Sequence, residues 1–362
     1  PTTGTAPLYI NQQLVSPNGT DINVHFDNQG EATLTTQYND VGQIQISAQY
    51  QDDSGFIIQG EQRVIHTPES LVLYRNDNDH QCHSIDAQCS RFQKAGESFD
   101  LAIKAVCWQQ DNDNNYRDNP TTPNFQLNDI AMTSTVIAPE TGSNGTLAVE
   151  TVDFSADDKG EKNIQQSLSE VGIFELSLSP PAYFGQNISV TPLTVGRFYP
   201  HSLGITMLNN DYAAAGECDF VYSGQPFSLT PDPLITVIAY NTNAEVTTNY
   251  RDDFAPLSVD DIRYTMPSTD DQQLGTTGTP LQIHVPDNEP TLDHSNGSLS
   301  FSFSGYEYQY LKQANSQIAP FTSQMTIRFN EIRDRDGITT ASPSDITFSG
   351  PNIYFGRLSI DS

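Results

Sequence analysis

Positive charge is scarce in this chain of 362 residues, which has 16 Lys and Arg against 45 Asp and Glu and a net charge of −29. Binding to a phosphate backbone or to an anionic membrane surface requires clustered cations, so the composition argues against nucleic acid as a partner. No run of about 18 apolar residues is present, so we expect no membrane insertion. The many carboxylates are expected to maintain solubility, and divalent-cation binding by some of them stays open.

Helical periodicity is nearly absent, and a short turn at 163–168 is the only helical candidate. Apolar residues instead alternate with polar ones, as in strands that turn one face to a core. The alternating runs are 22–26, 44–50, 99–105, 299–303 and 325–329. Asn-Gly pairs at 18–19, 144–145 and 296–297 indicate turns between strands. This pattern predicts an all-β fold of tandem immunoglobulin-like, Greek-key β-sandwich modules.

Several segments return along the chain in the same order, which is the signature of repeated modules. F-x-x-A-G-E-S-F-D-L at 92–101 returns as F-x-x-S-G-Q-P-F-S-L at 220–229. Other matches pair 41–47 with 171–177, 122–125 with 247–250, and Gly196-Arg197-Phe198 with Gly356-Arg357-Leu358. We predict a module at 1–63 that is the later part of a preceding repeat, and a second at 64–194. A third, at 195–362, has an insert near 258–290 and the start of a further segment.

Cysteine is rare, with four residues in the chain. Cys82 and Cys89 bracket a short polar loop and are the first predicted disulfide. Cys107 ends an alternating run and is expected in a core, either paired with Cys218 or with both thiols free. A disulfide and a composition rich in Asn, Thr and Ser predict an extracytoplasmic protein. Because the chain begins at Pro1 without the segments of a signal peptide, we expect a processed or excised piece of a longer protein.

The strongest candidate for ion binding is the D-x-D-x-N spacing of Asp111, Asp113 and Asn115, with Asp118 nearby. Such spacing lets oxygen ligands from one loop converge on calcium, although the Gly and late Glu of an EF-hand are missing. The alternative is a solvated loop rich in turn-forming residues. A second acidic loop, with Asp77 and Asp79, belongs to the same module and is expected at the same end of the sandwich, where the two loops would share an ion.

Two further clusters have structural explanations that are favoured over ion binding. Asp334 and Asp336 precede Gly337, but Arg333 and Arg335 alternate with them, which favours a salt-bridged turn. A zinc set can be drawn from His80, Cys82, His83 and Cys89, but its spacing is not that of a zinc finger, and an oxidising compartment favours the disulfide.

Sequence motifs of hydrolytic enzymes are missing, since the chain has no G-x-S-x-G elbow, no H-E-x-x-H and no P-loop. We therefore predict no catalytic residues and no enzymatic activity. Trp108, the single tryptophan, follows Cys107 and is expected to pack in a core.

The stretches Gly196-Arg197-Phe198-Tyr199-Pro200 and 218–227, which reads C-D-F-V-Y-S-G-Q-P-F, carry a resemblance to a known family. They resemble the C-terminal region of MshQ-type proteins of the mannose-sensitive haemagglutinin (MSHA) type IV pilus system, and segments 239–241, 248–250 and 354–358 extend the likeness. Ser223 stands where that family usually has Met. The resemblance implies a surface or pilus-associated protein with a region of unassigned function, and it supplies no catalytic residues.

The leading hypothesis is a non-enzymatic segment of a bacterial cell-surface protein, secreted through the periplasm, that acts as a stalk or presentation platform in adhesion or pilus assembly. Its expected partners are other pilus or cell-surface components, and glycans through loops at one sandwich end. One alternative is a carbohydrate-binding, lectin-like module, which an exposed aromatic platform would favour. Another is an accessory region of a glycoside hydrolase, whose catalytic cleft would need two carboxylates about 5–10 Å apart.

Overall fold

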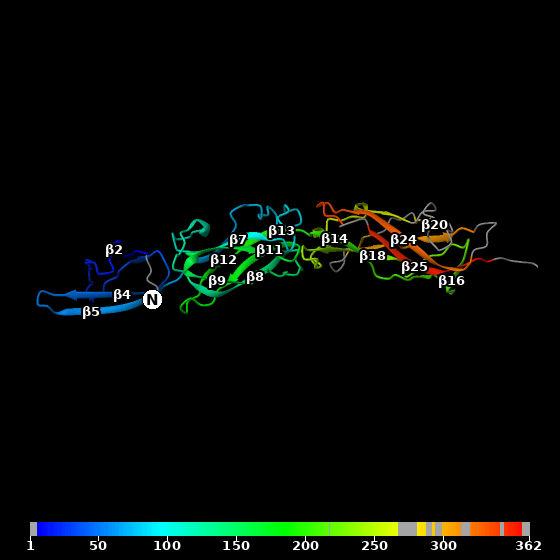
Figure 1. Ribbon diagram of the computed structural model, residues 1–362. Coiled ribbons are helices and arrows are strands. Elements are labelled where there is room, and N and C mark those ends of the chain that lie inside the picture. The colour runs from blue at the N-terminus through cyan, green and yellow to red at the C-terminus, as the bar shows by residue number, and fades with distance from the viewer. Residues whose placement is uncertain are drawn as a thin grey trace, which may run out of the picture.

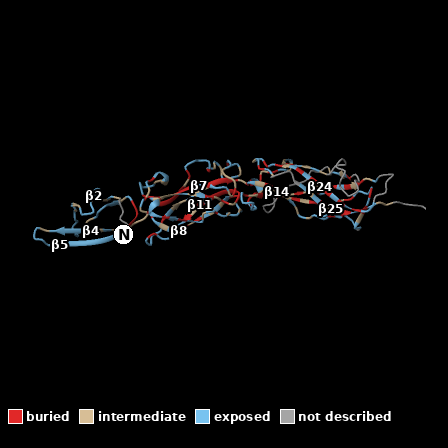
Figure 2. Ribbon diagram, viewed as in Figure 1, coloured by how far each residue is buried: buried red, intermediate tan, exposed pale blue. Residues whose placement is uncertain are grey.

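The computed structural model describes residues 6–216, 218–266, 281–286, 292–293, 299–312, 319–340 and 344–356. Their regular structure consists of strands and short 3₁₀ turns, arranged in three modules that follow one another along one long axis (Figure 1). We call residues 6–66, 70–198 and 202–356 the first, second and third modules. Burial is concentrated in the second and third modules (Figure 2). The fold is therefore all-β and tandem, as the alternation predicted.

The first module has two small sheets and few buried side chains. Its strands are β1 (Leu8–Ile10), β2 (Gln13–Val15) and β3 (Thr36–Tyr38) in one sheet, and β4 (Gly42–Gln51) and β5 (Ile57–His66) in a long hairpin. Ile10 and Val41 are its buried apolar side chains in the described residues, whereas Tyr50 is 63% exposed. The strand predicted at 22–26 is wrong: the segment is irregular and Phe26 is 68% exposed, so its alternation faces no core.

The second module is a sandwich of two four-stranded sheets. One sheet has the order β10 (Glu161–Gln166), β7 (Phe99–Val106), β6 (Ser70–Tyr74), β12 (Ser189–Thr191); the other has β13 (Leu193–Phe198), β11 (Gly172–Ser179), β8 (Leu127–Ala138), β9 (Thr151–Phe154). Both sheets contribute to one core, in which Phe174 and Phe198 are fully buried. The helical turn predicted at 163–168 is wrong, because β10 pairs with β7 along its length.

The third module repeats the sandwich with additional short strands. Its two main sheets are β14 (Ser202–Met207), β18 (Leu234–Tyr240), β22 (Leu299–Ser302), β21 (Leu292–Asp293), and β16 (Phe220–Tyr222), β25 (Ser344–Tyr354), β24 (Phe321–Ile332), β19 (Ile262–Thr265). Two small pairs are β15 (Ala213–Ala214) with β17 (Leu229–Thr230), and β20 (Leu281–His284) with β23 (Glu307–Tyr310). Most of the insert predicted near 258–290, and the turn at 296–297, lie outside the described residues.

Strand pairing defines which positions of the modules are equivalent. Gly42 pairs with His66 in the first module as Gly172 pairs with Phe198 in the second, so β4 and β5 correspond to β11 and β13. The predicted boundaries after residues 63 and 194 therefore fall inside strands β5 and β13.

Hydrogen bonds give a different equivalence at the C-terminal end from the one that the sequence echo suggested. Ser223 N donates to Tyr354 O, as Ala95 N donates to Tyr199 O at 2.8 Å. Tyr354 therefore takes the place of Tyr199, and Gly356 does not take the place of Gly196. Residues 357 and 358 of the echo lie outside the described residues.

The expectation that Trp108 packs in a core is wrong, since its side chain is 55% exposed. Successive side chains in an extended segment point to opposite sides, and the preceding Cys107 is the one that points inward, at 9% exposure. The neighbouring thiol thus takes the core position and the indole faces outward.

We predict that Phe198→Ala destabilises the second module by about 3–5 kcal/mol, because a fully buried ring leaves a cavity. The Phe198 ring packs against Phe92, Phe99 and Phe174 at centroid distances of 5.3–5.9 Å. Denaturant unfolding followed by circular dichroism measures the loss. Phe184→Ala is the matched control, since that ring is 53% exposed, and equal losses in the two variants would contradict the assignment of this core.

Candidate functional site at the inter-module joints and acidic loops

The loop at 111–118 uses several of its predicted ligand groups in local hydrogen bonds. Asp113 Oδ1 accepts a bond from Asn115 N at 2.9 Å, and Asn115 Nδ2 donates to Asp118 Oδ2 at 3.1 Å. Asp118 lies in the 3₁₀ turn η1 (Tyr116–Asp118). Asp113 Oδ2 is buried without a hydrogen-bond partner, which leaves one oxygen free for an ion. Calcium binding by Asp111, Asp113, Asn115 and Asp118 therefore stays a prediction.

The second acidic loop wraps around a buried arginine that the sequence did not single out. Arg75 donates from Nε to Asp77 Oδ1 at 3.0 Å and from Nη2 to Asp77 Oδ2 at 2.8 Å and to Asp79 Oδ1 at 3.2 Å. The guanidinium lies 4.8 Å from the centre of the Phe92 ring. Hydrogen bonds from Asp79 and Arg75 lower the pKa of Asp77, and burial raises the pKa of Asp79. Much of the carboxylate charge here thus compensates Arg75.

The two acidic loops lie beside each other, as expected for loops of one sandwich end. A cavity of about 290 Å³ is lined both by residues 72–75 and 80–81 and by residues 114–117. Among the described residues, the only group of three acidic, His or Cys ligands joins Asp77 and Asp79 to His80, so an ion shared by the two loops stays a prediction.

Of the four cysteines, two form the disulfide that the sequence predicted first, and the other two are free thiols. Cys82 and Cys89 form a disulfide that closes a seven-residue separation. Cys107 is buried in the second module and Cys218 is exposed in the third, and both are free thiols. Of the two possibilities left open for them, the structure has the unpaired one, because the two residues belong to different modules.

The joint between the second and third modules contains a buried ion pair. Arg197 of β13 donates from Nη1 and Nη2 to the two carboxylate oxygens of Asp336, at 2.6 and 2.8 Å, and from Nε to Cys89 O at 2.9 Å. The two side chains are 7% and 14% exposed. Asp336 is thus salt-bridged as predicted, but its partner comes from the preceding module rather than from Arg333 or Arg335. The neighbouring Asp334 is buried and accepts a bond from Tyr250 Oη at 2.8 Å.

A second contact at the same joint is made by Glu170, which is 6% exposed. Its Oε1 accepts from Thr248 N at 2.8 Å and Thr248 Oγ1 at 3.0 Å, and its Oε2 accepts from Asn249 N at 3.1 Å. Asn249 in turn donates to Ser143 O and Val171 O. Four groups of the third module therefore depend on atoms of the second.

Backbone atoms of the second and third modules are also in contact at this joint. Thr242 N donates to Ala95 O at 3.0 Å, and a Cβ added at Gly96, whose φ is +82°, would collide with Thr242. Ala95, Ala138, Val171 and Ile173 of the second module belong to the core of the third. The apolar core is thus continuous across the joint, and the two modules pack as one unit.

A buried carboxylate also connects the first and second modules at the first joint. Asp40 Oδ1 accepts from Asn124 N at 3.0 Å and from Val41 N at 2.8 Å, and the residue is 3% exposed. Asp40 precedes Val41 as Glu170 precedes Val171, and Asn124 matches Asn249 in the repeat. Burial raises the pKa of Asp40. Each joint thus places a buried carboxylate of one module on backbone N–H of the next, one group at the first joint and two at the second.

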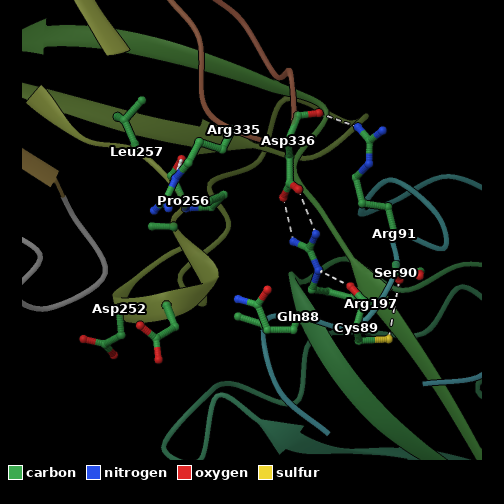
Figure 3. Close-up of a pocket in the computed structure, with 13 residues that line it drawn as sticks. Gln88, Cys89, Ser90, Arg91, Arg197, Asp252, Pro256, Leu257, Arg335 and Asp336 are labelled. Atoms are coloured by element: carbon green, nitrogen blue, oxygen red, sulfur yellow. Dashed lines mark hydrogen bonds and ion pairs between the residues drawn. The ribbon is translucent and has the colours of Figure 1, made fainter. Parts of the chain in front are cut away.

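A groove of about 1050 Å³ opens beside the Arg197–Asp336 pair. It lies between the disulfide loop of the second module and residues 252–257 and 335–336 of the third. Figure 3 shows Arg197 facing Asp336. Asp252 lies across the opening from Arg197, and Gln88 lies between Asp252 and Arg197. Asp252, Asp253, Arg91 and Arg335 are exposed at its rim, so the groove offers both hydrogen-bond donors and carboxylate acceptors.

These features define the class of protein: an array of immunoglobulin-like β-sandwich modules whose joints are buried and polar. Three family models match the chain, namely the domain of unknown function DUF6701, first Ig-like domain, over residues 1–61, the DUF6701 second domain over 67–167 and the DUF6701 third domain over 170–352. The chain belongs to the DUF6701 family. No curated protein matches it.

Several solved structures match the chain over much of its length. The adhesin InvE of Yersinia pseudotuberculosis is 18% identical, with 77% of this chain and 58% of that chain covered and a TM-score of 0.26. Invasin, a bacterial integrin-binding protein, is 11% identical, with 95% and 52% covered and a TM-score of 0.27. Domains 5–6 of the S-layer protein SbsC are 11% identical, with 80% and 100% covered and a TM-score of 0.20. The chain thus spans little more than half the length of the first two.

Among the described residues, no helix has the length and apolar character needed to cross a membrane. This finding agrees with the strand-based architecture of all three modules.

We predict that Arg197→Met destabilises the joined second and third modules by about 3 kcal/mol, because it leaves the Asp336 carboxylate without its cation. Arg263→Met is the control, since Arg263 is 74% exposed and lies 3.9 Å from Glu331. Its loss should stay below about 0.5 kcal/mol. The measurement is denaturant unfolding, and similar midpoints for both variants would show that the pair is dispensable.

Proposed function

We propose that the chain is a non-enzymatic segment of a bacterial cell-surface protein that acts in adhesion or pilus assembly as a stalk or presentation platform. The observation that carries this proposal is the joint of the second and third modules, where Glu170 and Arg197 are buried and bonded to the next module. A stalk has to keep its far end away from its base. Bending this joint would leave buried charges and N–H groups unpaired, which is costly, so the joint resists bending.

The proposed location is the cell surface, reached by secretion through the periplasm. The Cys82–Cys89 disulfide supports it, because disulfides persist in oxidising compartments. The resemblance of 196–200 and 218–227 to MshQ-type proteins supports a place in the MSHA type IV pilus system. The proposed partners are accordingly other pilus or cell-surface components.

We expect Glu170→Ala to make the array flexible while each module stays folded, because Thr248 N and Asn249 N lose their acceptor. Small-angle X-ray scattering would show a broader distribution of molecular lengths, with native circular dichroism retained. Glu175→Ala, an exposed glutamate on the following strand, is the matched control and should scatter as the unchanged protein does. An unchanged protein that already scatters as a flexible chain would overturn the stalk proposal.

A second candidate function, glycan binding by a lectin-like module, is favoured by the groove at the same joint. The groove is open and lined mainly by polar groups, with Leu257 and Ala255 as buried apolar neighbours. Carboxylates, amides and guanidinium groups around an open groove suit the hydroxyl-rich surface of a sugar. The glycoside hydrolase alternative has no such support in the described residues, because Asp336, the inner carboxylate of the groove, is paired with Arg197.

We predict that a glycan panel probed with the purified chain detects binding that Asp252→Asn/Asp253→Asn removes and Asp157→Asn, at an exposed site elsewhere, retains. Running the panel with calcium and then with chelator tests the proposed calcium loop, and Asp113→Asn should abolish any calcium-dependent part. No binding in either condition leaves the stalk proposal intact and refutes the lectin-like one.

A further inference from the structure

Outside the joints, three potential metal ligands gather in the loop that follows β6. Oxygen atoms of Asp77 and Asp79 and a ring nitrogen of His80 all lie within 4.8 Å of one another. The two carboxylates are exposed, with 55% and 57% of their side-chain surface open to solvent. Acidic groups in a loop are common without an ion, so the argument depends on the histidine.

His80 is buried and lacks the partner that a buried polar group normally has. The residue is 3% exposed, and its Nδ1 has no hydrogen-bond partner. That nitrogen lies 3.9 Å from Asp77 Oδ1 and 4.0 Å from Asp79 Oδ1, which is too far for a hydrogen bond but directed at both carboxylates.

Arg75 holds the two carboxylates in position through hydrogen bonds to their oxygens. Its guanidinium is bonded to both Asp side chains and to Asp100 O, and it lies over the Phe92 ring. Carboxylates that ligate metals are themselves usually hydrogen-bonded by neighbouring groups, and Arg75 has that arrangement. When both acids are ionised, the two carboxylates and the Arg75 guanidinium sum to a charge of −1, and Arg117 is a further cation near His80.

A cavity reaches His80, one of the three proposed ligands. The cavity of about 290 Å³ between the two acidic loops is lined by Arg75 and His80 together with Asn114, Asn115 and Arg117. Asp77 and Asp79 do not line this cavity, but both side chains are exposed, so an ion and its water ligands can reach the carboxylates from solvent.

We propose that Asp77, Asp79 and His80 bind a borderline divalent transition-metal ion, with zinc as the probe, rather than calcium. Calcium takes oxygen ligands, whereas imidazole nitrogen suits zinc, copper and nickel. Bonds of about 2.0–2.2 Å to three protein ligands require the loop to contract slightly around the ion. Water would complete the coordination of a site with three protein ligands.

The test is a thermal-shift and calorimetric titration with zinc alone, and with calcium alone, in a Cys218→Ser background that removes the exposed thiol. The expected result is a zinc-dependent rise in melting temperature that His80→Ala and Asp79→Asn each reduce at least tenfold in apparent affinity. His83→Ala, which removes an exposed histidine of the same loop, should bind as the background does. Calcium at the same concentration should give no shift that Asp79→Asn reduces.

The outcomes separate clearly. Zinc binding that survives both His80→Ala and Asp79→Asn, or no zinc binding in the background protein, would overturn the proposal. A calcium shift lost in Asp79→Asn without any zinc effect would overturn it in favour of an all-oxygen site. Asp79→Asn keeps the size of the side chain, so the test stands even if His80→Ala does not fold. None of these results bears on the rigidity of the joints, which scattering measures separately.

Discussion

A buried carboxylate that needs backbone N–H from the next module is the constraint on which the arrangement of this array depends. Asp40 provides it at the first joint and Glu170 at the second, each just before the strand that enters the joint. A charge removed from water is tolerated only while its hydrogen bonds are made, so each module has one favoured orientation on its neighbour. Tyr310 O in the third module accepts a hydrogen bond from Gly224 N, as Leu168 O in the second accepts one from Gly96 N, so these two residues are equivalent. Lys312, two residues after Tyr310, therefore stands at the position of Glu170 and has no carboxylate for such a contact. The acidic contact therefore marks the two internal joints.

Two of the cations of this acidic chain, Arg75 and Arg197, have structural roles inside it. Arg75 and Arg197 are both 6% exposed, and each is bonded to carboxylates and to a backbone carbonyl. Arg75 organises the acidic loop of the second module, and Arg197 joins that module to the third. Because an unpaired buried charge is costly, both arginines make their surroundings specific as well as stable. The surface keeps most of the negative charge, which favours solubility.

The sequence predicted those features that depend on neighbouring residues. Period-two alternation gave the all-β fold, and the short spacing of Cys82 and Cys89 gave their disulfide. Prediction failed where a partner distant in the chain decides the outcome. The alternation at 22–26 has no core to face, and the partner of Asp336 lies 139 residues away at Arg197. His80 was weighed with cysteines as a zinc set, whereas the structure places it beside two carboxylates.

The sequence by itself determined the class of fold, the repetition of modules and the acidity, because periodicity, ordered repeats and composition are properties of the chain alone. The tertiary structure decided how modules join and which polar groups meet. Glu170 and Asn249 are ordinary polar residues in the sequence, and they become a joint only when two sandwiches bring them together. Sequence patterns record which face of a strand is apolar, but the pairing of buried polar groups depends on three-dimensional distance, which no local pattern contains.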